Sequence, residues 1–146
     1  MLRYDGLYIS YYEDEEDRGV YTSCLRFYRN GTVICCVTCG EVEEIIKWFD
    51  KSNPNIRPGK YKVYGDRIEF SVKYEFNFEC SCLENGKEKR WMEFDLTKIN
   101  YKGSIVKDTL ELQIHSYRYR ENHKPIDKYF LEKYTFVETA DTFVTN

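Results

Sequence analysis

The chain has 146 residues, with 22 Lys and Arg against 25 Asp and Glu and a formal net charge of −3. That length fits one domain of the usual size, and we expect residues 1–146 to form it. A nearly balanced charge gives no overall attraction to nucleic acid or to an anionic membrane, so neither is expected as a partner. Aromatic residues make up 17% of the chain, which favours strands because rings fit pleated surfaces.

The two ends and the cysteines bear on cellular location. The first residues enter a strand pattern without the apolar core of a signal peptide, and no stretch approaches the roughly 18 apolar residues of a membrane helix. We therefore expect a cytoplasmic protein whose thiols are reduced. The cysteines are Cys24, Cys35, Cys36, Cys39, Cys80 and Cys82.

Residues 4–12 are expected to form the first strand. The acidic run 13–17 follows and is interpreted as a solvated loop, because it lacks the ligand spacing and central glycine of an EF-hand.

Residues 20–38 predict a β-hairpin, because an Asn-Gly pair lies between two runs rich in strand-forming residues. Two registers are open. A two-residue turn would place Cys24 opposite Val37, whereas a three-residue turn with a bulge would place Cys24 opposite Cys36. The second is favoured, since it gathers an apolar set on one face. That set is Leu25, Phe27, Val33, Cys35, Val37 and Cys39.

Residues 41–50 predict one short helix. Its apolar residues recur at i, i+3, i+4 and i+7, which gives a single stripe. They are Val42, Ile45, Ile46 and Phe49. A helix of about ten residues is unstable alone, so the stripe must pack on a sheet.

Residues 68–80 give the strongest strand signal, because seven apolar residues alternate there with polar ones. The apolar set is Ile68, Phe70, Val72, Tyr74, Phe76, Phe78 and Cys80. At roughly 3.4 Å per residue the strand spans about 40 Å. A strand of that length is typical of a barrel in which it bends or joins two sheets.

The remaining strands are joined mainly by tight turns. They are expected over 60–64, 90–97, 101–106, 109–119 and 127–137. In the 90–97 strand, the inward residues should be Met92, Phe94 and Leu96. The whole pattern predicts a mainly β fold, a single antiparallel up-and-down barrel of about 8–10 strands with one short helix. Closure into a barrel removes the exposed edges of an open sheet.

Several different short motifs are distributed along nearly the whole chain. They are Asp5-Gly6-Leu7-Tyr8, Leu25-Arg26-Phe27-Tyr28 before Asn30-Gly31-Thr32-Val33, Gly59-Lys60-Tyr61, Tyr101-Lys102-Gly103 and Tyr134-Thr135-Phe136-Val137. Together they resemble the calycin barrels, which include lipocalins and fatty-acid-binding proteins. The resemblance implies a lipocalin-like barrel. Lipocalins open with Gly-x-Trp, whereas Tyr8 stands in that place here, so no ligand specificity is carried over.

Candidate sites follow from the barrel and from three smaller motifs. The residues expected to line the barrel are Phe27, Tyr61, Phe70, Tyr74, Phe76, Phe94 and Leu112. The clustered cysteines are interpreted as reduced structural thiols, in preference to a zinc site or a disulfide. No metal or cofactor is therefore expected. His115 has the outward parity of a surface imidazole, and the alternating Tyr and Arg of 117–120 favour a charged strand edge over a surface for single-stranded nucleic acid.

Three classes of function stay open. The first is binding of a small apolar ligand inside the barrel, which needs a cavity. The second is a protein-interaction or structural module, with a barrel filled by side chains and an exposed apolar patch at Trp48 or Trp91. An enzyme is the least favoured class, and no catalytic residue is assigned.

Overall fold

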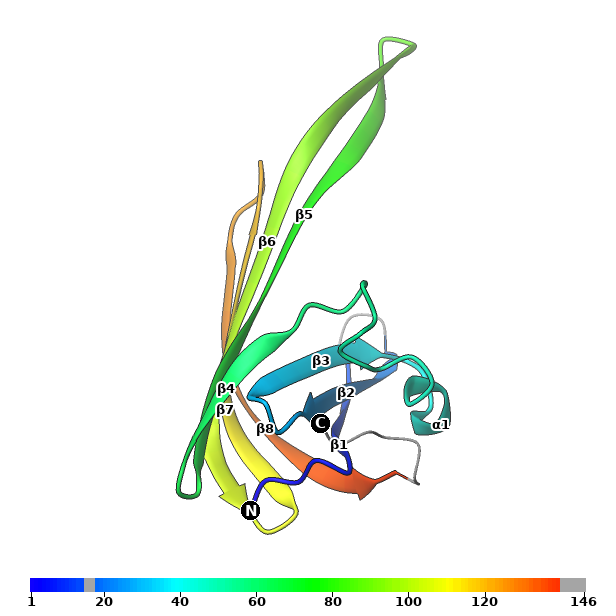
Figure 1. Ribbon diagram of the computed structural model, residues 1–146. Helices are drawn as coiled ribbons and strands as arrows, with labels where there is room; N and C mark the ends of the chain where they lie inside the picture. The colour runs from blue at the N-terminus through cyan, green and yellow to red at the C-terminus, as the bar shows by residue number, and fades with distance from the viewer. Residues whose placement is uncertain (15–17, 140–146) are drawn as a thin grey trace.

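Eight antiparallel strands and one short helix make up the computed structural model, which describes residues 1–14 and 18–139 (Figure 1). The strands are β1 (Gly6–Glu13), β2 (Val20–Phe27), β3 (Thr32–Thr38), β4 (Gly59–Tyr64), β5 (Arg67–Glu84), β6 (Lys87–Val106), β7 (Thr109–Arg120) and β8 (Ile126–Glu138). Each strand pairs with the next, and β1 pairs with β8, so the sheet closes. The predicted mainly β, up-and-down barrel with a single short helix is confirmed. Part of the expected acidic loop, residues 15–17, lies outside the described residues.

The helix α1 (Val42–Ile45) is shorter than the predicted 41–50. Backbone N–H groups of Trp48 and Phe49 still bond to the carbonyl of Ile45, which adds about one turn. At the end of this turn, the carbonyl of Phe49 accepts a bond from the Arg26 guanidinium at 2.9 Å. In the part of the chain that the structure describes, no helix has the length and apolar character needed to cross a membrane.

The β2–β3 hairpin adopts the favoured register. The N–H of Tyr28 donates to the carbonyl of Thr32 at 2.8 Å, and Cys24 lies opposite Cys36. Four residues of the predicted apolar face, Leu25, Phe27, Val33 and Cys35, are buried in the barrel core, whereas Val37 and Cys39 are exposed. Cys24 faces outward and packs under α1.

Strand β6 corrects two expectations. It runs unbroken from Lys87 to Val106, where two strands were predicted, because the segment between them continues the ladder with β5. Its buried odd-numbered residues, such as Tyr101, face the barrel interior. The expectation that Met92, Phe94 and Leu96 face inward is therefore wrong, since they lie on the opposite face.

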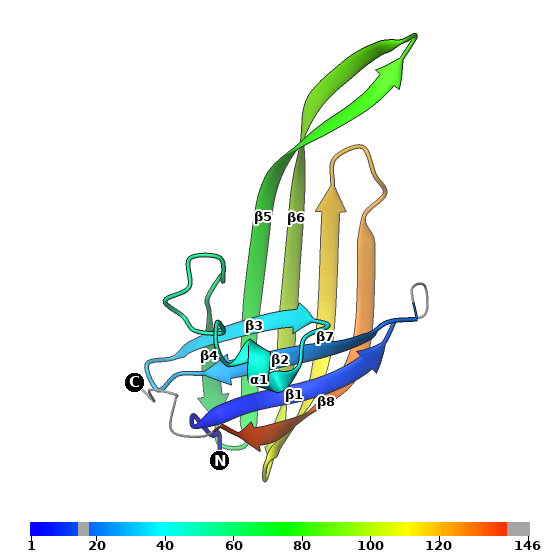
Figure 2. The ribbon, with the colours of Figure 1, turned by 90° about the vertical axis from the view of Figure 1, so that its right-hand side faces the viewer.

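The sheet has a closed part and an open part (Figure 2). β1 pairs with β8 only from Gly6 to Ile9, and β3 pairs with β4 at only two positions. Beyond these contacts the strands β5 to β8 leave the barrel together, and the β5–β6 hairpin projects furthest. We call the closed part the base. We call the continuation the platform, which comprises residues 73–98, 115–120 and 126–131.

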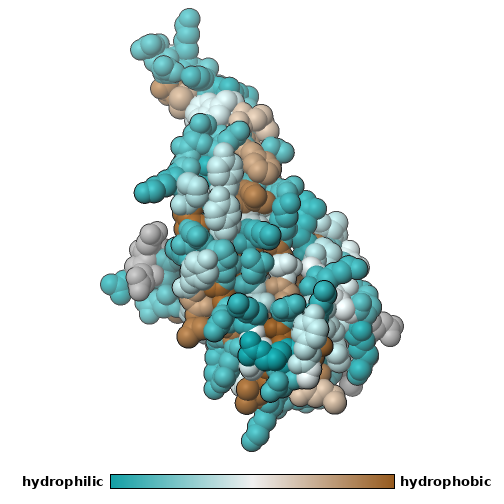
Figure 3. All heavy atoms as spheres, turned by 90° about the vertical axis from the view of Figure 1, so that its left-hand side faces the viewer, coloured by the Kyte–Doolittle hydropathy of each residue, from teal (hydrophilic) through white to brown (hydrophobic). Residues whose placement is uncertain are grey.

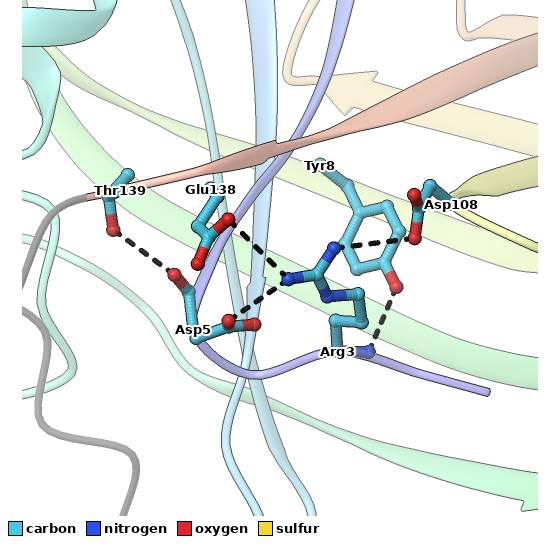
Figure 4. Close-up of polar contacts among 6 residues, drawn as sticks. All are labelled: Arg3, Asp5, Tyr8, Asp108, Glu138 and Thr139. Atoms are coloured by element: carbon cyan, nitrogen blue, oxygen red, sulfur yellow. Dashed lines mark hydrogen bonds and ion pairs between the residues drawn. The ribbon is translucent and has the colours of Figure 1, made fainter.

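Arg3 forms ion pairs with three segments near the place where β1 and β8 close the base (Figure 4). The Arg3 guanidinium lies 3.0 Å from the Asp5 carboxylate, 3.4 Å from Asp108 and 3.9 Å from Glu138. Its backbone N–H also donates to the Tyr8 hydroxyl at 3.0 Å. One side chain thus connects the N-terminal segment, the β6–β7 turn and the end of β8.

Candidate interaction surface

The interior of the base is occupied by side chains that contact one another. Phe27 packs edge-on against Tyr8, Tyr61 and Phe70, with ring centroids 5.1–5.6 Å apart. Phe70 in turn stacks on Tyr101 at 4.4 Å. Rings at these separations form the usual stabilising pairs of a packed core. These pairs lie in the interior in which a ligand was expected.

The seven residues predicted to line the barrel fall into three groups. Phe27, Phe70 and Leu112 are buried in the core of the base. Tyr61 and Tyr74 are half-buried at its margin: the Tyr61 hydroxyl donates to the carbonyl of Tyr28 at 2.6 Å, and the Tyr74 hydroxyl lies 3.2 Å from the Cys35 thiol.

The third group is Phe76 and Phe94, which lie on the platform. Phe76 shares the inner face of β5 with Phe70 but lies beyond the base, where its side chain is 54% exposed. Phe94 pairs with Asn77 and faces away from the interior. The structure therefore does not bring these two residues together with the other five.

A small polar cluster lies at the upper margin of the base. Glu132 accepts from the Ser10 hydroxyl at 3.1 Å and from the Tyr134 hydroxyl at 3.4 Å. The Tyr134 hydroxyl also lies 2.8 Å from that of Ser23. Burial raises the pKa of the Glu132 carboxyl above its usual value, and burial likewise raises the pKa of Tyr134. No cation lies within ion-pair distance of Glu132 in residues 1–14 and 18–139.

Two pairs of opposite charge occupy the inner face of the platform. Arg118 Nη2 lies 2.7 Å from Asp95, and Arg120 Nε lies 3.5 Å from Glu93. Hydrogen bonding to Arg118 lowers the pKa of Asp95, while the pKa of Glu93 is lowered first by the N–H of the Trp91 indole. The inner face therefore changes from apolar in the base to ionic on the platform.

The outer face of the sheet carries a shallow depression of about 700 Å³. Three lysines, Lys60, Lys62 and Lys102, lie along one part of it, and Tyr129 and Leu131 lie along the other. Figure 3 shows this face, where apolar patches alternate with hydrophilic side chains. A depression of this size is comparable to small-molecule sites.

His115 lies in that depression, on the outward face that its parity predicts. Its ring stacks on Tyr129 with centroids 4.2 Å apart, and Nε2 lies 2.5 Å from the Asp127 carboxylate. These contacts fix the Tyr129 ring above the sheet.

The platform carries a run of exposed apolar side chains in β8. Tyr129 is 75% exposed, Phe130 44% and Leu131 79%, and the three are consecutive in β8. Further members on β5 and β6 are Phe76, Leu83 and Met92. Because side chains alternate along a strand, Tyr129 and Leu131 lie on the outer face of the sheet and Phe130 lies on the inner face. Exposed apolar side chains at a strand edge are a feature of protein-binding sites. The suggested patches at Trp48 and Trp91 are less marked, since Trp48 packs edge-on against Phe49 and Trp91 is half-buried.

The platform also has two open strand edges. The partner of β8 on one side is β7, and β1 covers its other side only as far as Thr135. No described strand pairs with that side of residues 126–134. On the opposite border, β4 covers β5 only as far as Ser71, so that the edge from Lys73 onward is open.

The two edges differ in how they are protected. Along the β5 edge, the outward residues include Lys73, Glu75 and Glu79, and Lys73 bonds to Glu75 at 2.7 Å. Charges on an edge strand discourage pairing with other chains. The β8 edge instead presents Tyr129, Phe130 and Leu131 at its centre. It is therefore the better candidate for strand addition.

The cysteines form no metal site among the residues that the structure describes. All six are free thiols, and Cys39 and Cys82 are exposed. Burial raises the pKa of Cys35, so its thiol is a poor nucleophile. The prediction that these residues are structural thiols gains support from Cys24 and Cys35, which are buried in the two cores.

Comparisons with protein-family models, with curated proteins and with solved structures give no match. The resemblance to calycin barrels stays a prediction, because a closed eight-stranded barrel does not by itself identify that group.

Proposed function

We propose that this chain is a protein-interaction module that binds an extended strand of another protein chain along the open edge of β8. The observation that carries the proposal is the run Tyr129-Phe130-Leu131, three exposed apolar residues at the centre of a strand edge that no described strand covers. An added strand would satisfy the free backbone groups of this edge and cover the apolar side chains, which is the mode called β-augmentation.

The packing of the base supports this proposal over a carrier. A carrier needs a cavity with room for its ligand, whereas Phe27 of β2 and Phe70 of β5 contact each other across the interior. The platform, in contrast, leaves apolar side chains such as Tyr129 and Leu131 in solvent. A partner bound at the β8 edge would cover part of that surface.

A cytoplasmic setting is part of the proposal. Cys24 and Cys36 lie opposite each other in the β2–β3 hairpin, and a reducing compartment would keep them as thiols.

Site-specific photo-crosslinking tests the proposal. A benzophenone amino acid in place of Leu131 should yield a defined crosslinked product in the native host, because this residue lies on the β8 edge. The matched control is the same substitution at Val106, an exposed apolar residue on the same face of the sheet near the closed end. Absence of a product at Leu131, or the same products at both positions, would contradict the proposal.

Binding of a small apolar ligand is the second candidate, and the outer depression of about 700 Å³ favours it. Native mass spectra of protein purified from its host should then show extra mass that disappears under denaturing conditions. The bare chain mass of 17.6 kDa alone would count against this candidate.

A further inference from the structure

We infer that the strand that binds the β8 edge is β8 of a second copy, paired antiparallel about a two-fold axis through Phe130. This inference rests on the proposed function, since it names the partner of the same edge. It follows from the direction of the backbone groups, from the order of charges along β8 and from the polar contacts that those charges make in the single chain.

The backbone of β8 directs its odd-numbered residues toward the open edge. The N–H of Phe136 donates to the carbonyl of Asp108, on the β7 side, at 2.7 Å. Because bonding directions alternate along an antiparallel strand, the even residues of β8 bond to β7 and the odd residues face the other way. Asp127, Tyr129 and Leu131 thus present free N–H and C=O groups in the part of β8 that β1 does not cover.

Antiparallel pairing centred on Phe130 matches these groups between two copies. Each odd residue then opposes another odd residue, so Tyr129 of one copy exchanges two backbone bonds with Leu131 of the other. A two-fold arrangement repeats every contact, as in most homodimers.

The order of charges along β8 is complementary to itself in this register. Asp127 opposes Lys133 of the second copy, and Lys128 opposes Glu132. The apolar residues oppose one another at the centre, because Phe130 lies opposite Phe130 of the second copy. Opposite charges and aromatic residues at directly opposed positions each stabilise a sheet, whereas like charges destabilise it.

Neighbouring registers lose this complementarity. Pairing centred on Tyr129 would place Lys128 opposite Phe130, and pairing centred on Leu131 would place Glu132 opposite Phe130. Each would bury a charge against an aromatic ring without a partner, which is unfavourable. The sequence of the edge therefore specifies one register.

The single chain leaves several of these charges without an ionic partner. Lys128 and Lys133 form no ion pair with any described residue, and the half-buried Glu132 contacts only hydroxyl groups. Pairing with a second copy would place a cation beside each Glu132. It would also cover Tyr129 and Leu131, the most exposed apolar residues of the edge.

Sedimentation of the full chain tests the inference. Over about 1 to 200 µM, the mass should rise from 17.6 kDa toward twice that value. Lys133→Glu should raise the dissociation constant about tenfold or more, since two like-charge pairs replace two opposite-charge pairs. The double variant Asp127→Lys with Lys133→Glu should restore dimerisation.

Two further variants separate the dimer from general effects. Lys87→Glu makes the same charge change at the far end of the β5–β6 hairpin, away from the β8 edge, and should leave the dimer unaffected. Leu131→Pro removes an N–H that faces the open edge and takes no part in the β7 ladder. It should abolish the dimer while circular dichroism shows an intact barrel.

Amide exchange followed by NMR gives a second readout. The N–H groups of Tyr129 and Leu131 should exchange fast at low concentration and become protected as the dimer forms. A mass of one chain at all concentrations, with fast exchange at these amides, would overturn the inference. So would failure of the double variant to restore what Lys133→Glu removes.

The crosslinking experiment at Leu131 distinguishes this inference from the proposed function. A product of twice the chain mass supports both. A product with a different protein, in a chain that stays monomeric, overturns the second copy as partner and keeps strand addition as the function. No product at Leu131 and no dimer would overturn both.

Discussion

The base and the platform are built from the same strands but follow different rules of packing. On the inner face of β5, Phe70 in the base contacts Phe27 and stacks on Tyr101, whereas Phe76, six residues further, lies on an open sheet with half of its surface in solvent. The inner residues of β6 change likewise, from Tyr101 to the ionic Glu93. The difference shows that an inward-facing position on a strand is not buried by its position alone. A second layer of side chains must also cover that face of the sheet.

The largest expected effect compares these two phenylalanines. Phe70→Ala should lower the free energy of unfolding by about 3–5 kcal/mol, because a buried ring leaves a cavity. Phe76→Ala should cost less than about 1 kcal/mol, since its ring is largely solvated. Urea unfolding of both variants measures the contrast. Equal losses would mean that the platform is packed as tightly as the base.

A glycine in the base provides the next test. A Cβ on Gly103 would clash with the backbone carbonyl oxygen of Glu111, so the strands must separate to admit it. Gly103→Ala should cost about 1–3 kcal/mol through overpacking. Its neighbour Ser104→Ala serves as control and should change stability by less than about 0.5 kcal/mol in the same thermal or urea unfolding.

Shortening the platform should have a smaller effect. Removing Glu79–Met92 and joining Phe78 to Glu93 through Asn-Gly deletes the projecting end of the β5–β6 hairpin, which contains no buried residue. The free energy of unfolding should change by less than about 1 kcal/mol. A much larger loss would contradict the separation of base and platform.

The smallest effect concerns Glu132 and pH. Burial raises the pKa of Glu132 in the folded chain, so the folded state favours its protonated form. The stability that this form contributes is present below the unfolded pKa and is lost as the pH rises through the folded pKa. Glu132→Gln should therefore be more stable than the natural chain at pH 7, by less than about 1 kcal/mol after solvent screening, and equal to it near pH 4.

Protein concentration sharpens this last prediction. At low concentration the gain should be present, because Glu132 has no cation beside it. If a second copy supplies Lys128, the gain should shrink as the dimer forms. Unfolding curves at two concentrations and two pH values measure both effects.

Much of the base could be predicted from the sequence. The β2–β3 register follows from the set that gathers on one face, with Phe27 and Val33 opposite each other. The inward residues of β5 in the base follow from strict alternation, and Ile68, Phe70 and Val72 are buried as expected.

The platform could not be predicted in the same way. Glu93 and Asp95 occupy the inner face only because Arg118 and Arg120 reach them from β7, and a long-range partner leaves no local signal. For the same reason, the apolar alternation of Met92, Phe94 and Leu96 wrongly predicted that the even-numbered residues of β6 face the interior.

The β8 edge was missed because its exposure depends on where β1 turns away, which no feature of β8 encodes. One signal was present. Tyr129, Phe130 and Leu131 interrupt the alternation of an otherwise amphipathic strand, and such an interruption indicates a strand with apolar neighbours on both faces.

The ion pairs of Arg3 at the β1–β8 contact have a consequence for the order of folding. The β5–β6 and β7–β8 hairpins join residues close in sequence, whereas the β1–β8 seam joins the two ends of the described chain. Local hairpins form in microseconds and distant pairings much later, so the seam should close last. Arg3→Ala should then speed unfolding and leave the refolding rate unchanged in stopped-flow experiments. During synthesis, the two hairpins would exist for a time as a free sheet, and the seam would convert that sheet into a barrel.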